Sequence, residues 1–253
     1  MPTNNQSIVL SVVSHYQAEL IEKLFKSIDA SCNTGNLQVI LTINIKDDII
    51  PVVSGYSFPV NVVVNSKPKG FGENHNSAFR LSNGNYFCVI NPDCEFIEDP
   101  FPKLLNFLEY KGDIGVISPK VVDHCNVVQD NARKFITPVS IVKRYLFSSK
   151  EEYHIRGEEL IFPNWIAGMF MLLKSENYAL IGGFDEAYFM YCEDADLCLR
   201  LGNKGLVPAL LPTVSIVHDA RRSSRKKLKY LFWHLSSLSR FYFRYQLSLF
   251  RVN

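Results

Sequence analysis

The stretch Asn164–Leu201, NWIAGMFMLLKSENYALIGGFDEAYFMYCEDADLCLRL, is the segment around which the rest of the chain is organised. An apolar run with a single glycine leads into a short polar segment, and a Gly182-Gly183 turn and an aromatic patch follow it. The stretch then delivers three acids, Glu193, Asp194 and Asp196, at the start of a predicted helix. Carboxylates are stabilised in a first helical turn by the positive end of the helix dipole. The simplest interpretation is therefore an acidic helix start on the surface.

The residues in front of these acids favour a more specific interpretation. They carry large side chains, three of them aromatic: Tyr188, Phe189, Met190 and Tyr191. A carboxylate beside aromatic walls loses part of its hydration, which raises its pKa toward the range useful for a general base. Asp196 and Arg200 lie four residues apart, so we expect them to pair on one face of the helix. The acids are therefore predicted to be placed for a function rather than merely solvated.

Length and composition limit the class of protein and the number of domains. At 253 residues, with 47% hydrophobic and 21% charged residues, the chain is an ordinary globular protein with room for one large α/β domain or two small ones. No uncharged apolar run approaches the length of a membrane-spanning helix, and no secretory signal precedes Ser7. The six cysteines show no CxxC pair, which indicates reduced thiols. A cytoplasmic protein is the expectation.

Strand and helix patterns alternate along the first 90 residues, which predicts an α/β fold with a mostly parallel central sheet and helices on both faces. The predicted strands are Ser7–Val13, Leu37–Ile45, Val60–Val64 and Tyr86–Ile90, and the predicted helices are Ala18–Ile28 and Phe71–Leu81. A later strand, Val214–Val217, ends at His218, and the polar segment Ser148–Glu159 is predicted to be a mobile loop. Ligands bind such sheets beyond the carboxyl ends of the strands.

The segment Asn65–Asn76, NSKPKGFGENHN, follows one of these strand ends. Gly70 and Gly72 allow a close backbone approach to a ligand, and a helix N-terminus after them offers free N–H groups to an anion. The segment matches neither the dinucleotide fingerprint nor the phosphate-binding P-loop. A glycine-containing turn and a ligand site are equally supported by the segment alone.

Asn91-Pro92-Asp93 follows the next strand. A carboxylate at the end of a buried strand suits Mg²⁺, which uses few protein carboxylates and takes substrate phosphates and waters for the rest of its shell. An ordinary turn explains the three residues equally well when they are taken singly. His218 is in the same position, since a lone histidine at a strand end is either a ligand or a buried, hydrogen-bonded side chain.

Taken together in this order, the motifs resemble the family 2 glycosyltransferases, which are inverting enzymes of GT-A fold. The resemblance is greatest to the rhamnosyltransferase-like branch that builds O-antigen and other bacterial surface polysaccharides. It covers about residues 7–220, and the GGFDE…EDxDLxxR segment from Gly182 to Arg200 is its most specific part. It implies a GT-A domain at residues 1–220 and a basic, aromatic C-terminal helical extension at residues 221–253.

The resemblance implies transfer of a sugar from a nucleotide diphosphate donor to a saccharide acceptor, with Mg²⁺ or Mn²⁺ as cofactor. The branch favours dTDP-L-rhamnose as donor and an acceptor on a polyprenyl diphosphate lipid. A UDP-hexose donor and a non-catalytic sugar-nucleotide binding protein stay open as alternatives. So does a homo-oligomer, whereas nucleic acid is not expected, because no groove-reading motif accompanies the positive charge.

The resemblance also implies residue roles. Asp194 matches the general base, and Asp93 with His218 matches the metal site, in which Asn91 stands at the first position of the family's DxD motif. The donor would contact Ser14, His15, Asp47, Asn65, Gly70, Phe71, Gly72, Asn76, Asn91 and Asp93. The acceptor would contact Trp165, Gly168, Glu193 and Arg133.

The C-terminal extension differs in character from the rest of the chain. Six basic residues crowd its start, and aromatic and basic residues alternate after them. Two interpretations remain for the amphipathic helix predicted there. It lies at an anionic membrane interface, on the inner face of the cell membrane, or it packs its apolar face on the catalytic domain or on another subunit.

Overall fold

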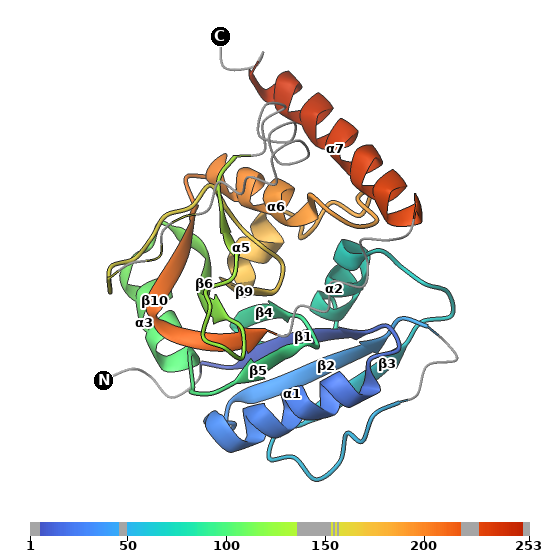
Figure 1. The fold of residues 1–253 in the computed structure, drawn as a ribbon, viewed down its shortest axis with the longest axis vertical. Helices are drawn as coiled ribbons and strands as arrows, with labels where there is room; N and C mark the ends of the chain where they lie inside the picture. The colour runs from blue at the N-terminus through green and yellow to red at the C-terminus, as the bar shows by residue number, and fades with distance from the viewer. Residues whose placement is uncertain are drawn as a thin grey trace.

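The computed structural model describes residues 6–45, 50–135, 153, 155, 157–218 and 228–249, and Figure 1 shows the arrangement of its elements. In chain order the elements are β1 (Ile8–Ser14), α1 (Ala18–Ser31), β2 (Leu37–Ile43), β3 (Val60–Val64), α2 (Phe71–Phe79), β4 (Tyr86–Ile90), β5 (Cys94–Phe96), α3 (Phe101–Tyr110), β6 (Ile114–Val122), β7 (Ala132–Arg133), β8 (Trp165–Ile166), β9 (Phe170–Lys174), α5 (Ser175–Leu180), α6 (Glu193–Gly202), β10 (Val207–His218) and α7 (Leu228–Leu249).

Eight strands form one sheet in the order β3-β2-β1-β4-β9-β6-β10-β5, and β7 pairs with β8 in a separate small sheet. The strands β3, β2, β1 and β4 are parallel. Because β9 is antiparallel to both β4 and β6, and β10 is parallel to β6, the strands β6 and β10 run in the same direction as β4. The predicted α/β fold with a mostly parallel sheet is confirmed.

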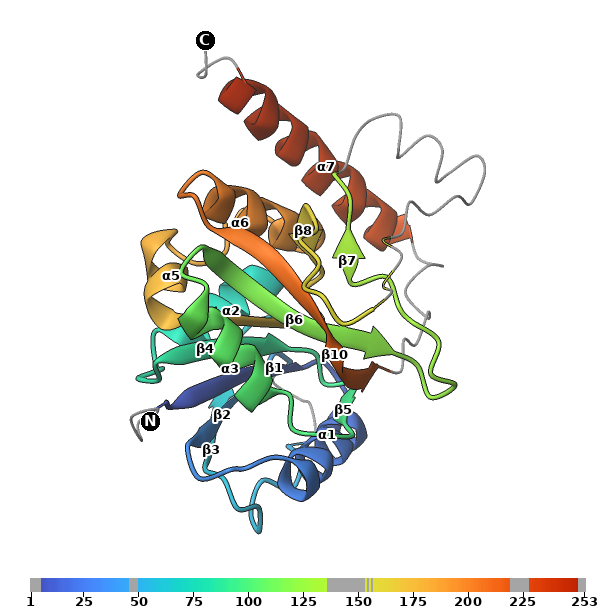
Figure 2. The same ribbon diagram turned by 90° about the vertical axis from the view of Figure 1, so that its left-hand side faces the viewer.

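Both faces of this sheet are buried because side chains alternate along each strand. In β1, Leu10 and Val12 face the core that α1 and α3 cover, whereas Val9 faces the core that α2, α5 and α6 cover. The helices therefore lie on both faces, as expected for parallel strands that join through helices. Figure 2 shows the molecule from a second side, with α6 and α7 at the end of the molecule opposite α1.

The predicted elements of the first 90 residues agree with the observed ones to within a few residues. The second strand ends at Ile43 rather than Ile45, and α2 ends at Phe79 rather than Leu81. Most of the loop predicted at residues 148–159 lies outside the described residues.

The helix predicted in the C-terminal extension is observed as α7, and it packs on the rest of the molecule. Leu238 and Phe241 are buried in the same core as α6, and the Ser237 hydroxyl donates a hydrogen bond of 2.8 Å to the carbonyl oxygen of Met190. Within the part of the chain that the structure describes, no helix has the length and apolarity needed to cross a bilayer.

Candidate active site

The carboxyl ends of six strands lie along one edge of the sheet, because β1, β2, β3, β4, β6 and β10 all run in the same direction. Backbone hydrogen bonds continue between neighbouring strands just beyond their last residues. Asn44 N–H donates to the Ser14 carbonyl and Asn65 N–H to the Ile43 carbonyl, each at 3.0 Å. The polar residues predicted at strand ends therefore share one edge of the molecule.

Asp93 and His218 meet at this edge although 125 positions separate them in the sequence. The antiparallel pairing of β10 with β5 sets His218 opposite Cys94, so the residue before Cys94 comes next to the imidazole. His218 Nε2 lies 3.2 Å from Asp93 Oδ1. This is ion-pair distance, yet the geometry is not that of a hydrogen bond, and Oδ1 is a buried oxygen without a hydrogen-bond partner.

An unpartnered buried carboxylate oxygen beside an imidazole nitrogen is what a divalent cation site requires of the protein. Over the described ranges, no group of three or more His, Cys, Asp or Glu side chains converges as a metal site. Asp93 and His218 therefore fit an ion that a diphosphate helps to hold, and do not form a complete protein cage.

Asp194 lies in the first turn of α6 and is held by backbone groups. Its Oδ2 accepts a hydrogen bond of 3.0 Å from Gly168 N–H, and its Oδ1 accepts one of 2.9 Å from Ala195 N–H. Burial raises the pKa of Asp194, although the positive charge of Arg133 and these backbone N–H groups act to lower it. A carboxylate of this kind is oriented by fixed donors and has a stronger affinity for a proton than an exposed aspartate.

Glu193, the neighbouring acid, is 6% exposed, and its Oε2 has no hydrogen-bond partner. Burial and then the charge of Asp194 raise the pKa of Glu193 well above its usual value. Two acids that share one site cannot both ionise at their usual pKa values, because each charge disfavours the other. Glu193 therefore holds its proton more tightly than Asp194 does.

The backbone that leads into these acids is strained. Tyr191 and Cys192 both adopt left-handed conformations, with φ of 74° and 64°. Consecutive non-glycine residues of this kind cost free energy and persist only where surrounding packing enforces them, which is often at functional sites. Here the tight backbone turn ends the aromatic segment and begins α6 directly on Glu193.

Two neighbouring residues connect the acid helix to the strand-end site. Gly168 N–H bonds Asp194, and the next residue, Met169, accepts a hydrogen bond of 3.0 Å from Asn91 N–H. A side chain added at Gly168 would come within 3.0 Å of the Phe71 ring and 3.9 Å of the Asp194 Cβ. The start of α2, the Asn91 turn and the start of α6 therefore adjoin one another around Gly168.

The glycines at the start of α2 are required by contacts within the protein. A Cβ at Gly70 would lie 2.8 Å from the Phe189 carbonyl oxygen, and one at Gly72 would lie 2.6 Å from the Phe184 Cβ. Phe71 N–H also donates to the Phe189 carbonyl at 2.9 Å. The close approach that was predicted for a ligand is thus used by residues 184–189, and donor contact by these glycines stays a prediction.

Asn65 belongs to a buried group of amides that fixes the segment before α2. Its Nδ2 donates to the side-chain oxygens of Asn44 (2.9 Å) and Asn74 (2.7 Å). Asn44 in turn forms two hydrogen bonds with the main chain of Lys69. Its Nδ2 donates to the Lys69 carbonyl oxygen, and its Oδ1 accepts from the Lys69 N–H. These amides therefore set the shape of the loop that a donor would meet.

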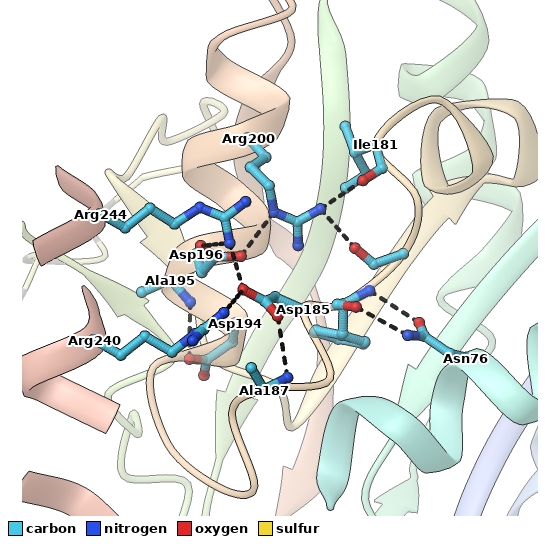
Figure 3. A network of polar contacts seen from close by, with 12 residues as sticks. Asn76, Ile181, Asp185, Ala187, Asp194, Ala195, Asp196, Arg200, Arg240 and Arg244 are labelled. Atoms are coloured by element: carbon cyan, nitrogen blue, oxygen red, sulfur yellow. Dashed lines mark hydrogen bonds and ion pairs between the residues drawn. The ribbon is translucent and has the colours of Figure 1, made fainter. Parts of the chain in front are cut away.

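Asn76 is fully occupied by the protein. Its Nδ2 donates to the Phe184 carbonyl (2.9 Å) and to Glu186 (3.0 Å), and its Oδ1 accepts from Phe184 N–H (2.9 Å) and the Tyr178 hydroxyl (2.7 Å). An amide offers two donors and two acceptor positions, so none is left for a ligand. Figure 3 shows Asn76 reaching from α2 to the turn in front of α6.

Arg200 forms the predicted pair with Asp196. Its Nε donates to Asp196 Oδ2 at 2.7 Å, and its Nη1 donates to the carbonyl oxygens of Ile181 and Gly183, each at 2.7 Å (Figure 3). Arg200 therefore joins the turn at residues 181–183 to α6. These hydrogen bonds hold the helix that carries Asp194 in place.

Two arginines of α7 extend this network (Figure 3). Arg240 Nη2 donates to Asp185 Oδ2 at 2.9 Å, and Arg244 pairs with both Asp185 and Asp196, the latter at 3.2 Å. Burial by itself would raise the pKa of Asp185, but Ala187 N–H and the two guanidinium groups hold it below its usual value. The C-terminal helix is therefore tied to the acidic segment by charge as well as by apolar contacts.

The predicted acceptor residues adjoin Asp194. The Arg133 guanidinium lies 4.8 Å from the centre of the Trp165 ring, and its Nε bonds the Asp130 carbonyl at 3.0 Å. Its charge acts on Asp194, which Gly168 also contacts. Stacking on an aromatic face and a main-chain bond fix the guanidinium beside the acid.

The structure therefore brings together two groups of predicted residues: the metal pair with Asn91, and the acceptor set with Asp194. Ser14 ends β1 at the same edge and His15 follows it, whereas Asp47 lies outside the described residues. Sequence reasoning missed Gln129, which bonds His218, and the contacts of Arg240 and Arg244 with the acidic segment. No local motif marks these residues, because each works through a partner far away in the sequence.

The mostly parallel eight-stranded sheet, with helices on both faces, has the GT-A fold that solved glycosyltransferases share. The family model of glycosyl transferase family 2 matches residues 7–185. The chain belongs to glycosyl transferase family 2.

Two rhamnosyltransferases are among the similar proteins. The chain is 26% identical over 247 residues to the rhamnosyltransferase WbbL of Escherichia coli K12, an alignment that covers 92% of each chain. It is 26% identical over 148 residues to the N-acetylglucosaminyl-diphospho-decaprenol L-rhamnosyltransferase of Mycobacterium tuberculosis H37Rv, which covers 54% of this chain and 47% of the relative. The chain thus matches the first relative nearly end to end and about half of the second.

Solved glycosyltransferases share the fold. GalNAc-T7 with UDP, GalNAc and Mn²⁺ superposes with a TM-score of 0.62 at 13% identity, over 84% of this chain and 43% of that one. The mannosyltransferase PcManGT of Pyrobaculum calidifontis, in complex with GDP-Man and Mn²⁺, has a TM-score of 0.57 at 15% identity, over 88% and 59%. The chain spans less than two thirds of either structure, and at these identities the likeness shows the fold alone.

Proposed function

We propose that this protein is an inverting glycosyltransferase that moves L-rhamnose from dTDP-L-rhamnose to a saccharide acceptor carried on a polyprenyl diphosphate, in the synthesis of O-antigen or another surface polysaccharide. The similarity to WbbL along nearly the whole chain supports the sugar. The similarity to the mycobacterial N-acetylglucosaminyl-diphospho-decaprenol L-rhamnosyltransferase supports the kind of acceptor.

Asp194 is the general base of the proposed reaction, and its placement is the observation that carries the proposal. A sugar hydroxyl is a poor nucleophile, so a base must remove its proton as it attacks the anomeric carbon. Asp194 is held by Gly168 and Ala195 through hydrogen bonds to separate carboxylate oxygens, and burial raises its pKa. One base with no enzyme nucleophile gives a single displacement, which inverts the anomeric centre.

Asp93 and His218 would hold a divalent cation, Mg²⁺ or Mn²⁺, together with the donor diphosphate. Such an ion neutralises the negative charge that develops on the leaving nucleoside diphosphate. The buried, unpartnered oxygen of Asp93 supports this assignment. The protein would fix these two ligands at a strand end, next to the Asn91 turn. Asn91 N–H donates a hydrogen bond to the Met169 carbonyl oxygen, and the preceding residue, Gly168, bonds Asp194.

The residues around Asp194 would receive the acceptor. Arg133 places a positive charge beside the base, and the buried Trp165 ring on which it stacks holds it there. Glu193, with its raised pKa, supplies a protonated carboxyl that donates a hydrogen bond to an acceptor oxygen. The domain division proposed with this function is a GT-A unit at residues 1–220 and the extension at residues 221–253.

The test is the variant Asp194→Asn. The amide keeps the shape of the side chain but has no basicity, so we expect transfer to fall by about 10²–10⁴-fold while nucleotide-sugar binding stays within about twofold of wild type. Asp113→Asn, an exposed aspartate in the turn before β6, is the matched control and should keep full activity. Near-wild-type turnover in Asp194→Asn would remove the base from its assigned role.

A thermal-shift panel of nucleotide sugars with Mn²⁺ tests the donor, because a ligand that binds the native state raises its stability. Stabilisation by dTDP-L-rhamnose above UDP-hexoses is the expected result. A larger shift with a UDP-hexose would show that the donor is a UDP-sugar rather than dTDP-L-rhamnose. The assignment as a glycosyltransferase would still stand.

A further inference from the structure

We infer that Gln129 is a positioning residue that fixes the ring of His218 as the Nδ1–H tautomer, and so presents the lone pair of Nε2 to a divalent cation beside Asp93. The inference rests on the proposed function, because it assigns a role to Gln129 at the proposed metal site.

Gln129 contacts His218 at two points. Its Nε2 donates to the His218 carbonyl oxygen at 2.8 Å, and its Oε1 lies 2.8 Å from the His218 Nδ1. The first bond fixes which way the amide faces, since the reversed amide would set two oxygens against each other. An amide oxygen only accepts, so Nδ1 must carry the proton that joins it to Oε1.

The backbone at Gln129 is itself held in place. Its N–H donates to the carbonyl oxygen of Val121 at 2.8 Å, and Val121 lies in β6, beside Ile216 of β10. The turn between them is closed by Asp123, whose Oδ1 accepts the N–H groups of Cys125 and Val127, each at 2.9 Å. Gln129 is thus attached to the strand next to the one that ends in His218.

The far side of the imidazole faces Asp93. With Nδ1 protonated and bonded to Gln129, a neutral ring leaves only Nε2 with a lone pair. This nitrogen lies 3.2 Å from Asp93 Oδ1, without the geometry of a hydrogen bond. Two electron-pair donors that approach each other without a shared proton repel unless a cation joins them.

This arrangement is typical of a metal-binding histidine, whose second ring nitrogen donates to an oxygen that fixes the tautomer and the ring orientation. If the glutamine only completed the hydrogen bonds of the fold, its removal would leave the affinity for the metal unchanged. The two roles therefore differ in the affinity for Mn²⁺.

The experiment compares Gln129→Ala and Gln129→Glu with wild type in two measurements. The tautomer of His218 is read from the imidazole ¹⁵N chemical shifts of the metal-free protein, and Mn²⁺ affinity is measured by calorimetry with a nucleoside diphosphate present. Val127→Ala is the matched control, because it lies in the same turn and its side chain is 59% exposed. Circular dichroism spectra and thermal unfolding verify that each variant is folded.

We expect Gln129→Ala to lose the Nδ1–H signature and to bind Mn²⁺ about 10- to 100-fold more weakly. Gln129→Glu keeps an oxygen acceptor for Nδ1–H but loses the donor to the His218 carbonyl oxygen, so it should retain the tautomer and recover only part of the affinity. Val127→Ala should match wild type in both measurements.

The inference is overturned if Gln129→Ala keeps the Nδ1–H tautomer or binds Mn²⁺ as tightly as wild type. If in addition wild type binds Mn²⁺ and Asp93→Ala does not, the metal site of the proposed function stands and only the role of Gln129 fails. If wild type binds no Mn²⁺, the metal assignment fails and the role of Gln129 fails with it.

Discussion

Arg133 acts on the base through its charge, while its Nε donates a hydrogen bond to the Asp130 carbonyl oxygen. The positive charge lowers the pKa of Asp194 against the raising effect of burial. Removing it in Arg133→Gln should therefore raise the pKa of Asp194 and move the acid limb of the rate profile to higher pH. Arg133→Lys should keep the limb close to wild type.

The measurement is kcat/KM between about pH 5 and pH 9 with saturating metal. A limb that does not move in Arg133→Gln would show that another group governs the acid side.

His75 is a second buried titratable residue, and its role is stability. Its Nδ1 lies 2.7 Å from the Ser11 hydroxyl in the middle of β1, and burial lowers its pKa from 6.5 to about 3. The neutral ring is therefore favoured in the folded protein. The stability that His75 contributes is complete above pH 6.5 and is lost as the pH falls from about 6.5 toward about 3, where the unfolded chain binds a proton and the folded chain does not.

Over this window the free energy of unfolding should fall by about 1.4 kcal/mol per pH unit through His75. Urea unfolding at pH 7, 6 and 5 measures it, and the difference between wild type and His75→Asn isolates it, because all other groups titrate in both proteins. Parallel slopes in the two proteins would contradict the assignment.

Not every residue of the site was predictable from the sequence. Asp194 and Asp93 could be proposed from the sequence, because their motifs lie within a few neighbouring positions and the chemistry of a carboxylate at a helix start or a strand end is local. Gln129 could not, since its role depends on the pairing of β6 with β10 and on the turn before it. The occupied amide of Asn76 was also hidden, because all its partners lie about 100 residues further on.

At the scale of elements, periodicity located the strands and helices of the first 90 residues because buried parallel strands are continuous apolar runs. It could not place α7, since an amphipathic helix has an apolar face whether that face meets protein or lipid. The structure shows that one face of α7 packs on the rest of the molecule through Leu238 and Phe241. Part of its other face stays apolar and exposed.

This exposed face of α7 provides a test of membrane contact that leaves the packed face intact. Phe232 and Phe243 are 70% and 69% exposed, so replacing both with serine should cost little stability. If the extension binds membranes, liposomes with anionic lipids should float wild type and lose most of the double variant. Tyr110→Ser on α3, with a side chain 85% exposed, is the matched control and should float like wild type.

Equal flotation of wild type and the Phe232→Ser/Phe243→Ser variant would count against membrane contact through this face. It would leave packing on the catalytic domain as the role of α7.

At the scale of the whole molecule, the metal pair joins strand ends that sequence places far apart, so donor binding should be linked to the stability of the fold. A nucleotide sugar at 100 times its dissociation constant stabilises the native state by about 2.7 kcal/mol, or roughly 5–10 °C in a chain of this length. With Mn²⁺ present, dTDP-L-rhamnose should give a shift of this size in wild type.

Asp93→Ala should lose most of this shift, because the ion that couples the diphosphate to the protein loses a ligand. Wild type without metal should resemble the variant. Asp113→Ala removes an exposed carboxylate just before β6 rather than a metal ligand, so it should keep the shift that Mn²⁺ produces. Equal shifts in Asp93→Ala and wild type would mean that the diphosphate is held by other groups at this edge of the sheet.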